Sequence, residues 1–263
     1  MTNYNALVDY IHAQPLHHVI VFDGYSGLGY AHPEKVFSAQ YEEMKEKAQA
    51  LNSLSEAIGL RAPLFVVAGA TADGIGMCYD VADKLKAEGF DIELVGIVSS
   101  AATIEESWGK ALPDVQAKRM DHLLVVDDPK QTWLVLNERG ESLMVQIALA
   151  TQSASVSFYG GGAVANSELV ELSYALANNS DASVNVTIRH GDGDFAPRAD
   201  KAEKKYQQVL QKSLANGMPA GVAARQAALE INGTAAYQAG TSKCPQLVGS
   251  AIGSELATDD QFM

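Results

Sequence analysis

Two glycine-rich segments of the chain could bind an anion, and they lie about 90 residues apart. The first covers residues 69–76 (GATADGIG) and the second covers residues 160–162 (GGG). Each follows a run of apolar, β-prone residues and leads into a helical pattern. Glycine lets the backbone approach a phosphate closely, and the N–H groups in the first turn of a helix have no partner within that helix. Together the two segments predict a phosphate group that is held from both sides.

A tight strand-to-helix turn that needs positive φ angles would also explain these glycines. Contact with a ligand is the favoured interpretation, because the first segment follows a strand at the edge where open α/β sheets bind ligands. The residues predicted to contact the ligand are Gly69, Thr71, Gly74, Gly76, Gly160, Gly161 and Gly162.

Other polar and aromatic residues follow the predicted strands or open the predicted helices. Tyrosine rings in these loops could stack on a base, and Tyr25 and Tyr159 are placed for this. Serine hydroxyls could bind the ligand, although serine is also common in turns. Asn166 and Ser167 could cap a helix or donate to a phosphate. The predicted ligand-binding residues outside the glycine segments are Gly24, Tyr25, Ser26, Gly27, Ser99, Ser100, Tyr159, Asn166 and Ser167.

Glu168 is a carboxylate in the first turns of the helix that follows the second glycine segment. A carboxylate is stabilised there by the helix dipole, and the residues alone favour this structural role. The alternative is a catalytic or ribose-binding group. Ser142 is predicted to cap a helix rather than to act as a nucleophile, because the chain has no Gly-x-Ser-x-Gly turn.

Composition excludes several classes of function. The chain has 263 residues and a net charge of −13 without a strongly basic segment, which argues against nucleic-acid binding. Cys78 and Cys244 are the two cysteines, too few for a disulfide scaffold or a zinc site of several thiolates. No pair of histidines has the i, i+4 spacing of a metal site, and we expect neither a metal nor another cofactor. The absence of a signal-peptide pattern and of a membrane-length apolar run predicts a cytoplasmic protein with no membrane partner.

Strands and helices alternate along the chain, as in parallel sheets that helices cover on both faces. Strands are predicted at residues 17–22, 64–68, 92–98, 123–126, 133–136, 155–159 and 184–188. Helices are predicted at residues 3–13, 37–58, 76–88, 141–150, 167–177 and 200–229, the last with a break at 217–219. We therefore expect an α/β, Rossmann-like domain over residues 1–195. Residues 196–263 would form a helical extension that packs on this domain or on a second subunit.

Four short segments of the chain, taken together, resemble the LONELY GUY (LOG) phosphoribohydrolases, a lysine decarboxylase-like family, and the wider SLOG superfamily. The segments are VFDGYSG at residues 21–27, VAGATADGIG at 67–76 and LVGIV at 94–98, together with Gly161-Gly162 followed by Glu168. The last matches the spacing of that family's Pro-Gly-Gly-x-Gly-Thr-x-x-Glu motif. The resemblance implies a Rossmann-like homodimer that binds a phosphorylated nucleoside or nucleotide derivative and hydrolyses its N-glycosidic bond, with Glu168 as the catalytic carboxylate.

The chain departs from the family pattern at several positions. The residue before the three glycines is Tyr159 rather than proline, Val164 stands where the motif has its third glycine, and Ala165 stands where it has threonine. The family also carries an arginine in the preceding helix, and residues 141–150 contain none. Arg139, just before that helix, is the nearest substitute for the catalytic cation.

Two alternatives to a hydrolase follow. Loss of the helical arginine favours a sensor or binding protein that uses the same pocket without turnover. Gly74-Ile75-Gly76 also resembles part of the glycine motif of NAD(P)-dependent short-chain dehydrogenases. That motif follows the first strand in those enzymes, whereas here the segment follows the second, and Leu210 stands where a lysine would follow Tyr206.

Overall fold

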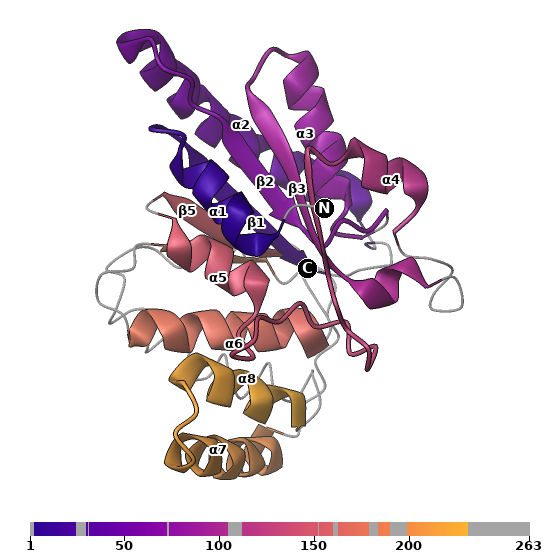
Figure 1. The fold of residues 1–263 in the computed structure, drawn as a ribbon, viewed down its shortest axis with the longest axis vertical. Helices are drawn as coiled ribbons and strands as arrows, with labels where there is room; N and C mark the ends of the chain where they lie inside the picture. Colours follow the sequence, from indigo (N-terminus) through magenta and orange to yellow (C-terminus); the bar gives the residue numbers. More distant parts are fainter. Residues whose placement is uncertain are drawn as a thin grey trace.

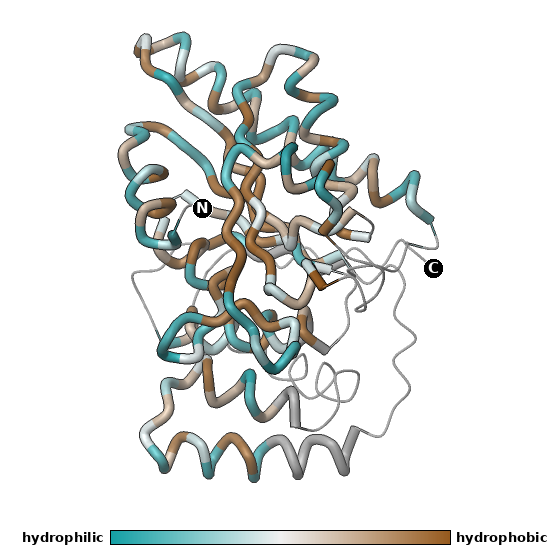
Figure 2. Tube along the Cα trace, turned by 45° about the vertical axis from the view of Figure 1, so that its right-hand side comes forward, coloured by the Kyte–Doolittle hydropathy of each residue, from teal (hydrophilic) through white to brown (hydrophobic). Residues whose placement is uncertain are grey.

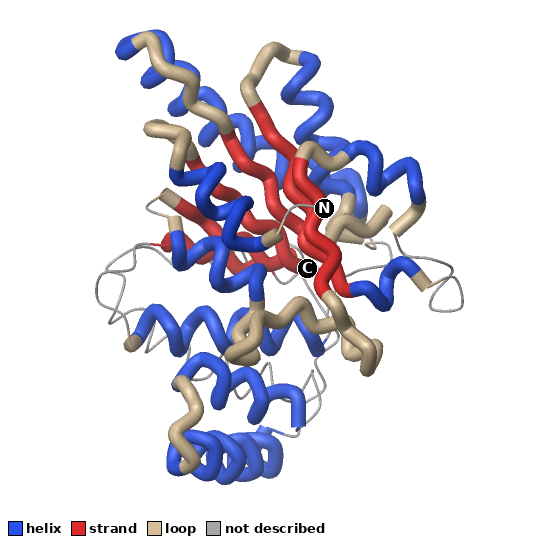
Figure 3. Tube along the Cα trace, viewed as in Figure 1, coloured by secondary structure: helices blue, strands red, loops and turns tan. Residues whose placement is uncertain are grey.

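The computed structural model describes residues 3–24, 30, 32–72, 74–104, 112–151, 153–159, 163–178, 184–189 and 199–230. Six strands form one sheet in the order β4-β3-β2-β1-β5-β6, and every neighbouring pair is parallel (Figure 3). Their bounds are β1 His18–Gly24, β2 Leu64–Ala68, β3 Ile92–Ser99, β4 His122–Val126, β5 Ala154–Tyr159 and β6 Val184–Arg189. The predicted α/β class and parallel sheet are confirmed.

The strands at the centre of the sheet are apolar on both faces because helices cover both. All residues of β2, β3 and β5 are buried, and β1 is buried up to its last residue, Gly24. In Figure 2 the strands at the centre of the molecule are coloured as hydrophobic, and the outer helices alternate between the two colours. Continuous apolar strands of this kind are typical of parallel sheets.

Helices form a layer on each face of the sheet (Figure 1). One layer contains α2 (Pro33–Ile58), α3 (Met77–Ala87) and the short α4 (Asp114–Arg119), over a core that includes Phe22 and Val66. The other contains α1 (Tyr4–His12), α5 (Leu143–Ala150) and α6 (Ala163–Ala177), over the opposite sides of the same strands. A 3-10 turn, η1 (Ser100–Thr103), follows β3.

Two further helices lie beyond α6, on the side away from the sheet (Figure 1). They are α7 (Ala199–Ala215) and α8 (Ala220–Glu230), separated as the sequence predicts by a break, in which Gly217 has a φ of 79°. Small apolar side chains of α8 pack against Val170 of α6 and Leu210 of α7. Helix α6 is therefore covered on both sides, which explains why most of its described side chains are buried.

Several parts of the chain differ from the sequence prediction, and α6, like α2, starts four residues earlier than predicted. No strand covers residues 133–136, because Trp133 has a φ of 64° and only Leu136 makes an isolated antiparallel bridge, to Ser142. The stretch between β3 and β4, where no helix or strand is predicted, contains η1 and α4. Helix α2 starts at Pro33, four residues before the predicted start at residue 37, since proline suits the first turn of a helix. Within the described residues, no helix is long and apolar enough to cross a bilayer.

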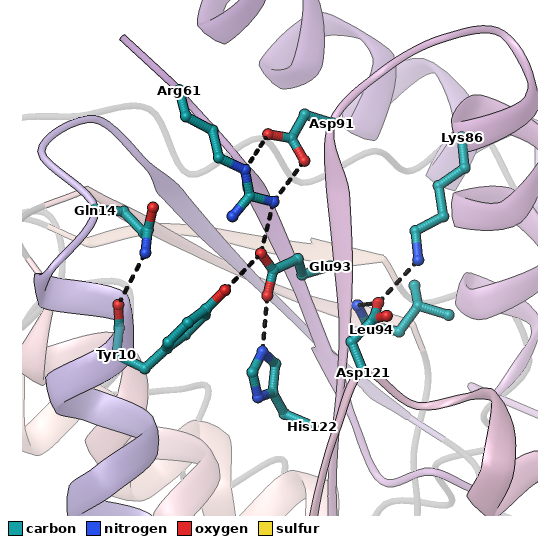
Figure 4. A network of polar contacts seen from close by, with 9 residues as sticks. All are labelled: Tyr10, Gln14, Arg61, Lys86, Asp91, Glu93, Leu94, Asp121 and His122. Carbon is teal, nitrogen blue, oxygen red and sulfur yellow. Dashed lines mark hydrogen bonds and ion pairs between the residues drawn. The ribbon is translucent and has the colours of Figure 1, made fainter.

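A polar network fastens α1 to the amino ends of β3 and β4 (Figure 4). Glu93 Oε1 accepts a hydrogen bond from Tyr10 (3.0 Å) and lies 2.7 Å from Arg61 Nη2, while Glu93 Oε2 lies 2.7 Å from His122 Nε2. Arg61 also forms a two-point contact with Asp91, 2.7 Å at each nitrogen. Burial raises the pKa of Glu93, but the hydrogen bonds from His122, Arg61 and Tyr10 together outweigh it and lower the pKa to about 2.

This network predicts a loss of stability in acid. The folded pKa of Glu93 lies below its usual value of 4.5, so its contribution is complete above pH 4.5 and disappears as the pH falls toward 2. We expect the free energy of unfolding to fall by up to about 3 kcal/mol over that window, and Glu93→Gln to remove this part of the pH dependence. Urea unfolding at a series of pH values measures it; an unchanged slope in the variant would contradict the assignment.

His18 gives a second pH effect in a separate window. Its imidazole is buried between the hydroxyls of Ser153 (2.8 Å) and Ser155 (2.9 Å), and burial lowers its pKa from 6.5 to about 4. The unfolded chain therefore takes up a proton between pH 6.5 and 4 that the folded protein does not. Stability from this group is complete above pH 6.5, and about 3 kcal/mol of it is lost as the pH falls to 4. In His18→Gln, the same unfolding series should be flatter between pH 4 and 6.5 only.

Candidate functional site

The carboxyl ends of β1 and β5 meet where the chain changes direction across the sheet. From β1 it builds outward through β2 and β3 to β4, and β5 then returns to the other side of β1. Open parallel sheets bind ligands at this switch point. Gly24, the last residue of β1, lies opposite Tyr159 of β5, and a Cβ on it would lie 2.6 Å from the Tyr159 carbonyl oxygen and 2.6 Å from the Tyr30 hydroxyl. Only glycine fits this close approach.

Two carboxyl groups are hydrogen-bonded to each other beside this point. Asp23 comes from β1 and Glu168 from the second turn of α6, and Glu168 is only 3% exposed. Asp23 Oδ1 accepts a hydrogen bond from the Gly24 N–H at 2.8 Å. Glu168 Oε1 accepts one from the Ser142 hydroxyl at 2.6 Å. Each carboxyl group therefore has hydrogen-bond partners within the protein.

Burial raises the pKa of both carboxyl groups, and it is the largest cause at each. The charge of Asp23 raises the pKa of Glu168 further, whereas the hydrogen bond from Glu168 acts in the opposite direction on Asp23. Two adjacent buried carboxylates strongly disfavour the doubly ionised state, so the pair favours sharing one proton. A carboxylic acid beside a carboxylate can supply one proton and accept another, which is the chemistry of general acid–base catalysis.

A buried ion pair lies next to these carboxyl groups and links α6 to the C-terminal helix α8. The Ser142 N–H donates to Glu171 Oε1 at 2.9 Å, and Arg225 Nε of α8 lies 2.7 Å from Glu171 Oε2. Arg225 and Glu171 are 4% and 1% exposed. Burial raises the pKa of Glu171 to about 7, while the charge of Arg225 favours its ionised form.

The first glycine segment forms a compact turn. Gly74 has a φ of 62° and Ala70 a φ of 55°. Gly76 has an ordinary helical φ, but a Cβ on it would lie 1.9 Å from the Thr71 carbonyl oxygen, which also accepts a hydrogen bond from Gln116 Nε2 at 3.1 Å. These contacts account for Gly74 and Gly76 as turn residues. Phosphate binding by this segment, which includes Gly69 and Thr71, stays a prediction.

Several of the predicted ligand-binding hydroxyls bond to other parts of the protein. The Tyr159 ring is buried near Phe22 and its hydroxyl donates to Glu43 Oε2 at 3.0 Å. Ser167 donates to the Val164 carbonyl at 2.7 Å. Ser99 donates to the Asp128 carboxylate at 2.8 Å, and Ser100 accepts from the Asp128 N–H at 2.9 Å, so these serines hold the loop that follows β4.

The structure places Arg139 on the surface. Its side chain is 72% exposed and pairs with Glu141 at 2.7 Å. The buried cation whose charge acts on Glu168 is Arg225, from the helical extension. Tyr25, Ser26, Gly27, Gly160, Gly161 and Gly162 lie outside the described residues, as does the side chain of Asn166.

Sequence reasoning missed Asp23, Glu171 and Arg225 as members of one cluster. Asp23 does carry a signal, because it is the first charged residue after the apolar run that forms β1. Arg225 and its neighbour Gln226 are flanked by small apolar residues of α8, and a charge within such a segment indicates a buried and paired side chain. Ser142 does occupy the N-cap position of α5, but its hydroxyl serves Glu168 and makes no capping bond.

The described part of the chain contains neither a candidate metal site nor a reactive thiol. No group of three or more acidic, histidine or cysteine side chains there could hold a metal ion. Cys78 is buried, and burial raises the pKa of its thiol, so it is not a reactive nucleophile. In comparisons with known proteins, neither a protein-family model nor a curated protein matches the chain.

Proposed function

We propose that this protein binds a phosphorylated nucleoside or nucleotide derivative at the carboxyl edge of β1 and β5 and hydrolyses its N-glycosidic bond. The observation that carries the proposal is the buried, hydrogen-bonded Asp23–Glu168 carboxyl pair at the switch point of a parallel sheet. The LOG-like glycine segments and the position of Glu168 after the second of them support the choice of ligand.

The pair has both groups that this hydrolysis needs. Water forms a bond from its oxygen to the anomeric carbon and gives up a proton to the Asp23 carboxylate. The bond from that carbon to the base nitrogen breaks, its electrons leave with the base, and Glu168 supplies the proton that neutralises the leaving nitrogen. The products are the free base and the sugar phosphate. Proton exchange between the hydrogen-bonded carboxyls then restores the starting state.

A binding protein without turnover is the second candidate, and one observation favours it. Glu168 is almost fully buried and already bonded to Asp23 and Ser142, so a ligand must displace or approach one of these contacts before Glu168 can protonate it. The position of Arg139 on the surface also favours this candidate, since the hydrolase family places a cation at the ligand.

Incubation with each nucleoside 5′-monophosphate separates the two candidates. Chromatography detects released base, and thermal unfolding in parallel detects binding. The hydrolase predicts free base from at least one of them. Stabilisation by one nucleotide with no release would leave only the binding function, and neither response to any of them would overturn both.

We further propose that the protein works in the cytoplasm as a homodimer. The LOG-like segments support the dimer, and a chain with only two cysteines suits a reducing compartment. A sizing measurement tests the dimer, and a monomeric mass at working concentration would contradict it.

A further inference from the structure

We infer that Arg225 of α8 is a positioning residue that sets the charge of the Asp23–Glu168 pair through Glu171 and Ser142. Helix α8 would then be part of the site rather than an appendage to the domain. The inference rests on the proposed function only in treating the pair as the reacting group. The residues that carry it come from β1, α6 and α8 and from the N-cap of α5.

Ser142 departs from the usual behaviour of its position. A serine at an N-cap normally accepts a hydrogen bond from the helix backbone with its side chain. Here its hydroxyl donates to Glu168 and makes no capping bond to α5. Its N–H is held by Glu171, one helical turn along α6 from Glu168. Ser142 therefore contacts both glutamates. Its side chain makes no capping bond and instead donates a hydrogen bond to the carboxyl pair.

Arg225 brings a positive charge to the buried carboxyl group of Glu171. Glu171 is 1% exposed, and an ionised carboxylate at such a site needs a cation in contact with it. Arg225, whose Nε lies 2.7 Å from Glu171 Oε2, is that cation; the contact is an ion pair without the geometry of a hydrogen bond. Small residues let α8 lie close to α6. A Cβ added at Gly221 of α8 would lie only 3.0 Å from the Glu171 carbonyl oxygen. The close approach of α8 to α6 therefore delivers the guanidinium to the buried carboxylate.

The charges that face the pair come from each packed element. They are Asp23 on β1, Glu168 and Glu171 on α6, Arg225 on α8, and Glu141 in the loop before α5, whose charge acts on Glu171. Neutralising Arg225 removes the positive charge and should make Glu168 hold its proton to higher pH. Neutralising Glu171 leaves Arg225 without its counter-charge and should make Glu168 ionise at lower pH.

The test is a carbon-13 NMR titration of the full-length protein labelled at glutamate carboxyls, with the Glu168 signal assigned by its absence in Glu168→Gln. We expect the Glu168 midpoint to rise by about one pH unit in Arg225→Gln and to fall by about one unit in Glu171→Gln. The double variant should return close to wild type, and Arg225→Lys should keep the wild-type midpoint within a few tenths. Shifts in the same direction in both single variants, or no shift in either, would overturn the inference.

Two outcomes need a control: a variant that does not fold, and a protein that does not hydrolyse nucleotides. If Arg225→Gln does not fold, Glu171→Gln and the double variant still decide, because glutamine can accept the Ser142 N–H in place of Glu171. The titration needs no substrate. The expected shifts without any base release would support the inference and refute the hydrolase, whereas base release with no shifts would do the reverse.

Discussion

Glu168→Gln is expected to slow release of the base by about 100- to 10,000-fold, the range that a positioned acid contributes to proton transfer. The amide cannot supply a proton to the leaving nitrogen, but its NH₂ can donate to Asp23 and its oxygen can accept from Ser142. The free energy of unfolding should therefore change by less than about 1 kcal/mol at neutral pH. Asp23→Asn should reduce the rate in the same way, because it removes the carboxylate that accepts the proton from water.

The matched control for this loss is Glu93→Gln. Glu93 is also a mostly buried, hydrogen-bonded glutamate, but it lies in the network at the amino ends of the strands (Figure 4). Its substitution should leave the rate unchanged at a temperature where the variant is folded. A wild-type rate in Glu168→Gln would contradict the proposed chemistry, and an equal loss in Glu93→Gln would show that the assay reports stability.

Gly76→Ala is expected to lower the free energy of unfolding by about 3 kcal/mol, at the upper end of the range for overpacked sites. The added Cβ would lie 1.9 Å from the Thr71 carbonyl oxygen and 2.8 Å from the carbonyl carbon, and backbone atoms cannot rotate away as a side chain can. The turn that starts α3 has to open to relieve the contact. Urea unfolding measures the loss.

Gly59→Ala separates this crowding from the general cost of replacing glycine. Gly59 ends α2 with a φ of 70°, and nothing lies within 4 Å of its added Cβ. Its substitution should cost only about 1–2 kcal/mol, the strain of a left-handed residue. Equal losses at the two positions would mean that the Thr71 contact does not determine the need for glycine at residue 76.

Much of the fold could be predicted because its signals are local. The apolar runs of β2 and β5 have the length and composition of buried strands, and the prediction of residues 64–68 agrees with β2 at both ends. The loop after β4 could not be predicted in this way. It takes its shape from Asp128, whose carboxylate accepts bonds from Ser99, Thr132 and the Trp133 N–H, and such convergence is not visible in hydrophobic spacing.

The site was only partly predictable for a related reason. Glu168 could be singled out because its spacing from a glycine pair is a sequence pattern. Its partners Asp23, Ser142 and Arg225 come from segments far apart in the chain, and no local sequence pattern joins them to Glu168. Arg139 was chosen by nearness in sequence, whereas the cation that acts on Glu168 comes from α8.

An NMR footprint of the nucleoside monophosphate that most stabilises the protein tests the central claim most directly. Backbone signals of Asp23 and Gly24, at the carboxyl edge of β1, should shift on titration in wild type and in Glu168→Gln, and the signal of Glu168 on α6 should shift in wild type. Signals of Glu93 and His122, at the amino ends of β3 and β4, should stay in place. Shifts confined to those amino ends, or no saturable shift near Gly24, would contradict a nucleotide site at the carboxyl edge of β1 and β5.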